Sequence, residues 1–448
     1  MKRTLIHNAT IVNEGQSAKG SVVIEDGRIA EVLTNRKPLS APCDETIDAT
    51  GCYLLPGIID DHVHFRDPGL THKADILTES RAAAAGGVTS IMDMPNTTPA
   101  TTTLDALNAK FDLLNEKCIV NHSCYFGATN DNYSEFGKLD KHRVCGIKLF
   151  MGSSTGNMLV DKMNSLLNIF NGTDMLIAAH CEDQETIKNN LTKYKDMFAG
   201  ENDIPIGKHP YIRSSAACYA SSELAVRLAR IAGARLHILH VSTAKELQLF
   251  NDYSLSEKHI TAEACVAHLL FTLSDYRTLG TRIKCNPAIK KQADRDALRA
   301  AVNSGLIDVI ATDHAPHLLS EKEGGASKAM SGMPMIQFSL VSMLQLVDEG
   351  VFTLETIVEK MCHAPAQIYR INERGYIREG YRADLVLVRP DTPWEVTADK
   401  VLSKCGWSPL EGHTFNWKVE KTFANGHLIY SDSRVDDAYR GEELRFGD

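Results

Sequence analysis

The chain has 448 residues, of which 43% are hydrophobic, and its formal net charge is −9 at pH 7. That length suits one large barrel plus a smaller unit, and the acidic balance argues against nucleic acid or a membrane surface as the partner. Eleven cysteines without paired spacing indicate reduced thiols and a cytoplasmic protein. No apolar segment is long enough to span a bilayer, so we expect a small-molecule ligand.

The two ends of the chain share a pattern of short alternating strands. Asp26-Gly27 and Asn425-Gly426 each separate two apolar runs, and such pairs are strong hairpin signals. Neither end has enough apolar surface to be stable alone. We therefore predict one composite β-sandwich domain made of residues 1–52 and 371–448.

The middle of the chain, residues 53–370, alternates strand-like and helix-like segments, as parallel βα units do. The predicted strands are Leu54–Val63, Val88–Met94, Val120–Gly127, Val144–Phe150, Met175–His180, Leu236–Val241, Ile260–Ala264 and Val309–Asp313. Eight strands predict an α/β fold of the (β/α)8 TIM-barrel class. The alternative is an open doubly wound sheet, but no Gly-x-Gly-x-x-Gly follows a strand.

Polar residues that can bind a metal occur at the ends of several predicted strands. His62 and His64 lie two apart and share one face of the first strand. Later strands end at or contain Asn96, Lys148, His180, His240 and Asp313. Because the carboxyl ends of barrel strands meet at one face, this set predicts a metal site there. The alternative is a group of unrelated polar residues in the core.

Lys148 lies within a strand, where a buried ammonium is unfavourable. Beside cations its pKa should fall, and the neutral amine could then form a carbamate that bridges two divalent ions. We treat the carbamate as a hypothesis. The alternative is a lysine that extends its ammonium to solvent or pairs with a carboxylate.

Other histidines lack strand-end partners. We expect His237 to face the side of its strand opposite to His240 and to have a packing role. The position of His314, beside Asp313, suggests a supporting residue. The remaining histidines of this kind are His7, His122, His142, His209 and His363.

Six motifs together resemble the cyclic amidohydrolases, and most closely dihydroorotases of the single-chain bacterial type. They are His62-Val63-His64-Phe65-Arg66-Asp67-Pro68-Gly69, Met94-Pro95-Asn96-Thr97, Lys148-Leu149-Phe150, Ala179-His180-Cys181-Glu182, Leu239-His240-Val241-Ser242 and Thr312-Asp313-His314-Ala315-Pro316-His317. The resemblance covers nearly the whole chain, including the divided β domain.

The resemblance implies two zinc ions per subunit, bridged by carbamylated Lys148 and a hydroxide. His62, His64 and Asp313 would bind the more buried zinc, and His180 and His240 the other. Asp313 would also carry the proton during catalysis. A homodimer is expected.

The resemblance also implies that Arg66, Asn96 and His317 bind the substrate carboxylate, and that Asn286 contacts the substrate. A guanidinium suits a carboxylate; the alternative for Arg66 is a surface ion pair with Asp67 or Asp75. Ser154 and Thr155 would belong to a lid, unless their segment is an ordinary loop.

The implied reaction is the reversible cyclisation of N-carbamoyl-L-aspartate to L-dihydroorotate in pyrimidine synthesis. The enzymatic alternatives are a hydantoinase (dihydropyrimidinase) or an allantoinase, whose substrates lack this carboxylate. The non-enzymatic alternative is a metal-free scaffold of the same fold.

Overall fold

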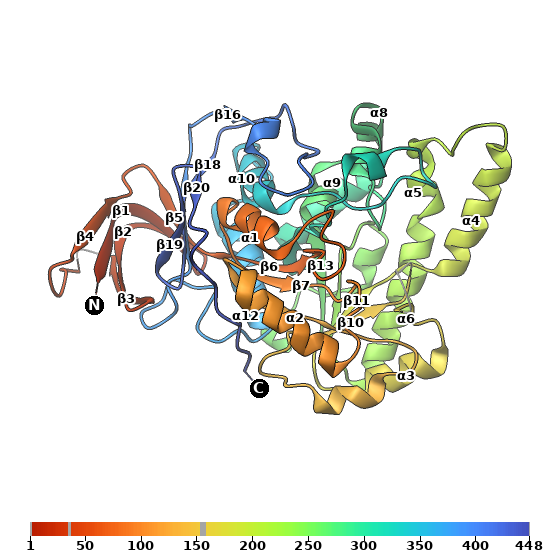
Figure 1. The fold of residues 1–448 in the computed structure, drawn as a ribbon, viewed down its shortest axis with the longest axis horizontal. Helices are drawn as coiled ribbons and strands as arrows, with labels where there is room; N and C mark the ends of the chain where they lie inside the picture. The colour runs from red at the N-terminus through yellow and green to blue at the C-terminus, as the bar shows by residue number, and fades with distance from the viewer. Residues whose placement is uncertain (1, 35–36, 153–157, 448) are drawn as a thin grey trace.

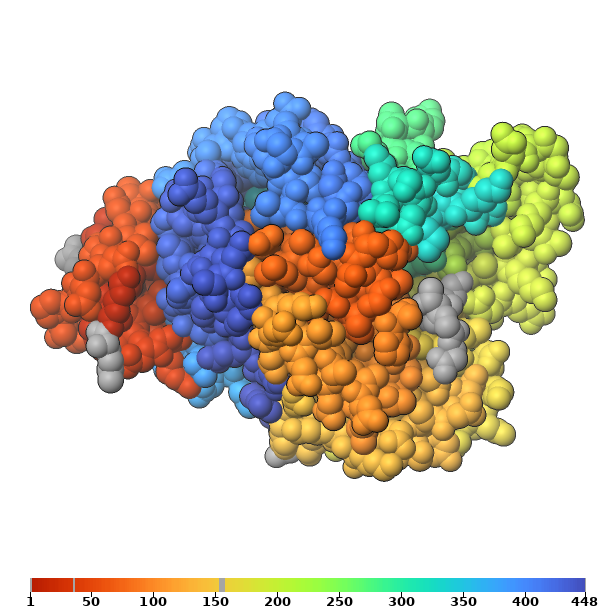
Figure 2. Space-filling model, viewed as in Figure 1, coloured from red at the N-terminus to blue at the C-terminus, as the bar shows by residue number. Residues whose placement is uncertain are grey.

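The computed structural model describes residues 2–34, 37–152 and 158–447. The chain forms a helix-covered barrel with a β-sheet unit on one side (Figure 1). Both ends of the chain contribute to this sheet unit, and the C-terminal residues lie between the N-terminal strands and the barrel on the face shown in Figure 2. The predicted fold class is therefore confirmed.

Parallel strands build the barrel. They are β6 (Ile58–Val63), β7 (Val88–Asp93), β8 (Asn121–Cys124), β9 (Phe126–Gly127), β10 (Ile147–Phe150), β11 (Ile177–His180), β12 (Leu236–Ile238), β13 (Ile260–Cys265) and β14 (Val309–Ala311). β8 and β9 flank Tyr125 and together occupy the third strand position, since β8 pairs with β7 and β9 with β10. A parallel bridge between Val63 and His314 closes the barrel, so the ends of the first and last strands adjoin.

Helices connect these strands and cover the barrel. The α-helices are α1 (Ile76–Ala85), α2 (Leu104–Lys117), α3 (Met163–Asn171), α4 (Gln184–Met197), α5 (His209–Ile212), α6 (Ser215–Ala232), α7 (Val266–Leu270), α8 (Tyr276–Leu279), α9 (Gln292–Ser304), α10 (Ser339–Asp348), α11 (Leu354–Val358) and α12 (Ala364–Ile368). Local sequence explains their ends: the Asp75 side chain accepts from the Thr78 amide to cap α1, and Gly233 adopts φ 68° after α6. Among the described residues, no helix is both long enough and apolar enough to cross a membrane.

The terminal unit is one nine-stranded sheet. Its strands are β1 (Arg3–Asn13), β2 (Gln16–Glu25), β3 (Arg28–Thr34), β4 (Glu45–Asp48), β5 (Tyr53–Pro56), β15 (Leu385–Arg389), β18 (Lys418–Ala424), β19 (His427–Ser431) and β20 (Arg434–Val435). A separate pair, β16 (Trp394–Glu395) and β17 (Thr414–Phe415), lies outside it. Both predicted hairpin turns are present: Asp26-Gly27 joins β2 to β3, and Asn425-Gly426 joins β18 to β19.

The predicted strand Leu54–Val63 is divided at Gly57. β5 pairs with β1 and β15 in the terminal sheet, whereas β6 belongs to the barrel. A Cβ at Gly57 would lie 2.1 Å from Thr89 Oγ1, so the close contact with β7 requires glycine. We propose that the boundary between the two units falls at this residue.

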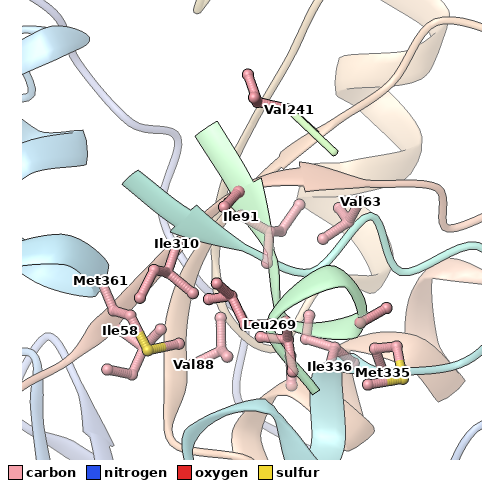
Figure 3. Close-up of a cluster of buried hydrophobic side chains, with 14 of the residues drawn as sticks. Ile58, Val63, Val88, Ile91, Val241, Leu269, Ile310, Met335, Ile336 and Met361 are labelled. Carbon is pink, nitrogen blue, oxygen red and sulfur yellow. The ribbon is translucent and has the colours of Figure 1, made fainter. Parts of the chain in front are cut away.

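The apolar core joins the barrel strands to the surrounding segments. Figure 3 shows Ile58, Val88 and Ile310, from three strands, beside Met361 and Leu269 from outside the barrel wall. All five are buried. This packing fixes the strands, and therefore the side chains at their carboxyl ends.

Candidate functional site

The ten predicted site residues that the structure describes line one cavity of about 960 Å³. They are His62, His64, Arg66, Asn96, Lys148, His180, His240, Asn286, Asp313 and His317. The predicted lid residues, Ser154 and Thr155, lie outside the described residues. The cavity therefore brings together side chains from β6, β10, β11 and from the segments that follow β7, β12 and β14.

The first half of the site is the group His62, His64 and Asp313. Asp313 Oδ1 lies 3.3 Å from His62 Nε2 and 3.1 Å from His64 Nε2. Three donor atoms this close, two imidazole nitrogens and one carboxylate oxygen, form a group that could hold a metal ion.

The outward nitrogens of these two histidines have their own partners. His62 Nδ1 lies 3.0 Å from Glu263 Oε1, and His64 Nδ1 lies 2.7 Å from Asn96 Oδ1. If each Nδ1–H donates to its oxygen, each Nε2 is unprotonated, and its lone pair faces the side of the cavity where Asp313 lies. This is how metal-binding histidines are usually oriented.

The second half of the site is the pair His180 and His240. His180 Nδ1 and His240 Nε2 are 2.9 Å apart. His180 Nε2 lies 3.0 Å from Glu182 Oε2, which also pairs with Arg213. His240 Nδ1 is buried without a hydrogen-bond partner among the described residues.

Burial controls the charge of these groups. It lowers the pKa of His62 and of His64 to about 4, so both imidazoles are neutral near pH 7 and able to bind a cation. Burial raises the pKa of Asp313, but His62, His64 and Lys148 outweigh it and hold that pKa below its usual range. Asp313 is therefore an anionic acceptor.

Lys148 is fully buried on β10 with its Nζ over the Phe150 ring, 4.6 Å from the centroid. Burial lowers the pKa of its ammonium to about 8, although the Asp313 and Glu263 carboxylates oppose the shift. The neutral amine of Lys148 therefore forms more readily near neutral pH than that of a free lysine. Neutral amine is the form that reacts with carbon dioxide.

Arg66 and His317 lie together on another wall of the cavity. Arg66 Nε donates to Pro316 O at 3.1 Å, and Nη2 lies 3.1 Å from His317 Nε2. The alternative ion pairs of Arg66 are not formed, because Asp67 pairs with Lys117 and Asp75 pairs with Lys404. Arg66 is only 7% exposed, so its guanidinium belongs to the cavity wall.

Three of the site residues have left-handed backbone conformations. Arg66, His240 and Asp313 have φ values of 67°, 40° and 48°. Such conformations cost about 1–3 kcal/mol each in residues other than glycine, and they persist where the surrounding structure imposes them. The alternation of side chains along an extended strand therefore does not predict the directions of these three side chains.

His237 differs in part from the prediction. It has a packing role, but its Nε2 lies 3.3 Å from Asp61 Oδ2 and 3.9 Å from Glu263 Oε2. Because Glu263 also reaches His62, His237 faces the barrel interior below the site and not the opposite side of the strand. The left-handed turn at His240 breaks the alternation on which the prediction relied.

Two further histidines lie at or beside the site. His314 supports the site as expected: its Nε2 lies 2.8 Å from Glu79 Oε2, and its Nδ1 accepts from the Met335 amide at 3.0 Å. His209, which has no strand-end partner set in the sequence, lines the cavity.

Two carboxylates of the site were not predicted from the sequence. Glu263 contacts His62 Nδ1, and it also accepts from the His240 amide at 2.8 Å. Glu182 contacts His180. Both carry a signal in the sequence. Glu263 is an acidic residue inside an apolar strand, and Glu182 lies two residues after the predicted ligand His180.

Comparison with known proteins places this geometry in a family. Residues 53–429 match the Amidohydrolase family. A dihydroorotase from Trichlorobacter lovleyi is 32% identical over 95% of this chain and 99% of that protein, and an allantoinase from Bacillus velezensis is 29% identical over 96% and 94%. The solved structure of an L-hydantoinase from Arthrobacter aurescens superposes with a TM-score of 0.91 at 27% identity, covering 97% of this chain and 98% of that one.

The chain belongs to the amidohydrolase family. Its general function is that of a hydrolase acting on the amide bond of a small cyclic molecule, the class to which these relatives belong. The members named here act on different rings, so the family does not identify the substrate.

Proposed function

We propose that this protein is a dihydroorotase, which interconverts N-carbamoyl-L-aspartate and L-dihydroorotate in pyrimidine synthesis. The observation that carries the proposal is the buried pair of Arg66 and His317 in the same cavity as the metal-binding histidines. A buried guanidinium needs an anion, and dihydroorotate carries a carboxylate beside its ring amide. Relatives named dihydroorotase support the choice.

The donor set fits two zinc ions. Neutral imidazoles and carboxylates are ligands that zinc prefers, and the outward nitrogens of His62, His64 and His180 are held by acceptors. We propose that His62, His64 and Asp313 would hold one ion, that His180 and His240 would hold the other, and that carbamylated Lys148 would supply an anionic ligand to the pair. When bound, the two ions would supply a hydroxide at neutral pH and polarise the ring carbonyl.

The protein's own groups orient the substrate and move the proton. Arg66, His317 and Asn96 would hold the carboxylate. Asn286 lies in the same cavity, and its buried Oδ1, which has no hydrogen-bond partner among the described residues, can accept from a ring N–H. Asp313 is an anionic acceptor between the two ligand histidines. In hydrolysis of the ring it would take the proton of the attacking water and deliver it to the departing ring nitrogen; ring closure is the reverse.

The second candidate is a hydantoinase or an allantoinase, favoured by the relatives with those names. Their rings lack the carboxylate, so they would leave Arg66 buried without an anion. Separate assays with dihydroorotate, a hydantoin and allantoin test the choice. Turnover of dihydroorotate is expected to exceed the other two, whereas preference for either neutral ring would refute the proposal.

Metal removal tests the role of the histidines. Treatment with a chelator is expected to abolish dihydroorotate turnover, and added zinc should restore it, because neutral imidazoles alone do not generate a nucleophile from water at pH 7. Elemental analysis of the untreated protein should find two zinc ions per chain. Full activity in a demonstrably metal-free sample would contradict the assignment of these histidines as metal ligands.

Lys148 can be tested by both metal content and mass. The Lys148→Ala variant is expected to lose most bound metal and at least a hundredfold in kcat, since its bridging anion is gone. Lys148→Arg, which keeps a cation but forms no stable carbamate, should show the same losses of metal and of kcat as Lys148→Ala. Native mass spectrometry of the wild type should show the added mass of one carbon dioxide. An alanine variant with two metals and normal turnover would refute the carbamate.

The homodimer and the cytoplasmic location stay predictions. Light scattering at several protein concentrations tests the first, and fractionation of the source cells tests the second.

A further inference from the structure

Glu79 is a buried carboxylate that lies beside the site without lining the cavity. It belongs to α1, and its side chain is fully buried. Its Oε2 lies 2.8 Å from His314 Nε2, and its Oε1 accepts from the Lys404 amide at 3.0 Å. A carboxylate in the interior is unfavourable unless donors surround it, so these two donors account for its burial.

The contacts of the His314 ring define which nitrogen carries the proton. Nδ1 accepts from the Met335 amide at 3.0 Å and from the Ile336 amide at 3.2 Å. A backbone N–H can only donate, so Nδ1 carries no proton and Nε2–H donates to Glu79. The ring is therefore held at both nitrogens, and its edge also packs against Phe65, with the ring centroids 6.0 Å apart.

The backbone of His314 adjoins two candidate metal ligands. It follows Asp313, whose φ is 48°, and its carbonyl oxygen accepts from the His64 amide at 2.8 Å. A left-handed conformation is strained in an aspartate and persists only where the surrounding structure imposes it. A fixed His314 therefore helps to keep Asp313 in the conformation that directs its carboxylate toward His62 and His64.

We propose that Glu79 is a positioning residue, which acts through His314 to set the direction of the Asp313 carboxylate. The proposal rests on the proposed function, in which that carboxylate moves the proton. Glu79 does not line the cavity, so its effect on the reaction is indirect and should appear in the chemical step more than in substrate binding.

The segment between β16 and β17 holds this arrangement from outside the barrel. The amide of Lys404 donates to Glu79, and Trp407 donates from Nε1 to His317 O at 2.8 Å. Trp407 is only 2% exposed. The same segment therefore contacts the loop after β14 directly at His317 and through Glu79 at His314.

The first test is spectroscopic and uses Glu79→Met, which keeps an unbranched side chain of similar length but removes both acceptor oxygens. In the full-length protein labelled with ¹⁵N-histidine, His314 of the wild type should show an Nε2–H proton shifted downfield by its carboxylate acceptor. The variant should lose this shift, and His314→Gln assigns the signal. The measurement requires no substrate, and circular dichroism checks that each variant is folded.

Kinetics give the second readout. Glu79→Met should lower kcat for dihydroorotate by about tenfold to a hundredfold, because a misdirected Asp313 transfers the proton poorly. KM should change much less, because Arg66 is not altered. Glu79→Gln keeps one acceptor oxygen and should recover part of the loss. In the His314→Gln background, Glu79→Met should add little further loss, because it acts through that ring.

The matched control is Glu31→Met. Glu31 is a carboxylate of the terminal sheet, only 8% exposed, that accepts from the Ser40 amide at 3.1 Å. Its replacement should leave the His314 signal and kcat unchanged.

The outcomes separate this inference from the proposed function. If the wild type hydrolyses a different cyclic amide, the proposed function fails, and the same comparison with that substrate still tests Glu79. If Glu79→Met does not fold, the wild-type signal and Glu79→Gln decide the question. A wild type without the downfield Nε2–H signal, a folded Glu79 variant with normal kcat, or parallel changes in kcat and KM would overturn the inference.

Discussion

Replacement of Asp313 by asparagine is expected to lower kcat for dihydroorotate by about 10²–10⁴-fold, the usual contribution of a positioned general base. The asparagine keeps the shape and one oxygen of the side chain but removes the negative charge that accepts the proton. The wild-type side chain is anionic near pH 7, because the site holds the pKa of Asp313 below its usual range. KM should change much less than kcat, because Asp313 lies with the metal-binding groups and Arg66 holds the carboxylate.

Metal content separates the two roles of Asp313. If the variant retains two metals, the lost turnover belongs to proton transfer; if it retains one, the ligand role contributes. Asp313→Glu serves as the comparison, since it keeps the charge but displaces the carboxylate. Near-normal turnover of Asp313→Asn would exclude Asp313 as the proton carrier.

Replacement of Arg66 by methionine should lower kcat/KM for dihydroorotate. The expected loss of transition-state stabilisation is about 2–5 kcal/mol, the cost of truncating one partner of a buried charged pair. This corresponds to a loss of roughly 30-fold to a few thousand-fold. Hydrolysis of a hydantoin should stay within about threefold of the wild type, because that ring has no carboxylate to lose an interaction. Metal content should not change.

Arg81→Met is the matched control for Arg66→Met. Arg81 is a partly exposed arginine of α1 paired with Asp437, so its loss should change neither substrate preference nor kcat/KM by more than about twofold. Equal losses for dihydroorotate and hydantoin in Arg66→Met would show a structural role and contradict the carboxylate assignment. Arg66→Lys should recover only part of the activity, since lysine lacks the planar fork.

Most of the architecture could be predicted from the sequence. Asp26-Gly27 and Asn425-Gly426 have local turn chemistry, and the barrel strands have apolar runs of the right length, so short-range pattern was sufficient. The division at Gly57 was not predictable, because residues on both sides are equally apolar. What separates them is a long-range contact with Thr89 and the pairing of β5 with β15.

The sequence predicted which residues belong to the site better than it predicted how their side chains are oriented. Strand ends identify His62, His180 and their partners because the barrel gathers those ends at one face. Glu263, which contacts His62 and the His240 amide, comes from a strand without a ligand motif, and only the folded chain brings it near. The positive φ values at Arg66 and His240 are likewise imposed by tertiary contacts.

The order of strands in the terminal sheet also has a consequence for biosynthesis. β5 pairs with β15, which the ribosome produces about 330 residues later, and β15 separates β5 from β18 in the sheet. The N-terminal strands must therefore remain with an open, aggregation-prone edge while the whole barrel is being made. We therefore expect chaperones to bind the nascent chain until β15 has been synthesised and can pair with β5.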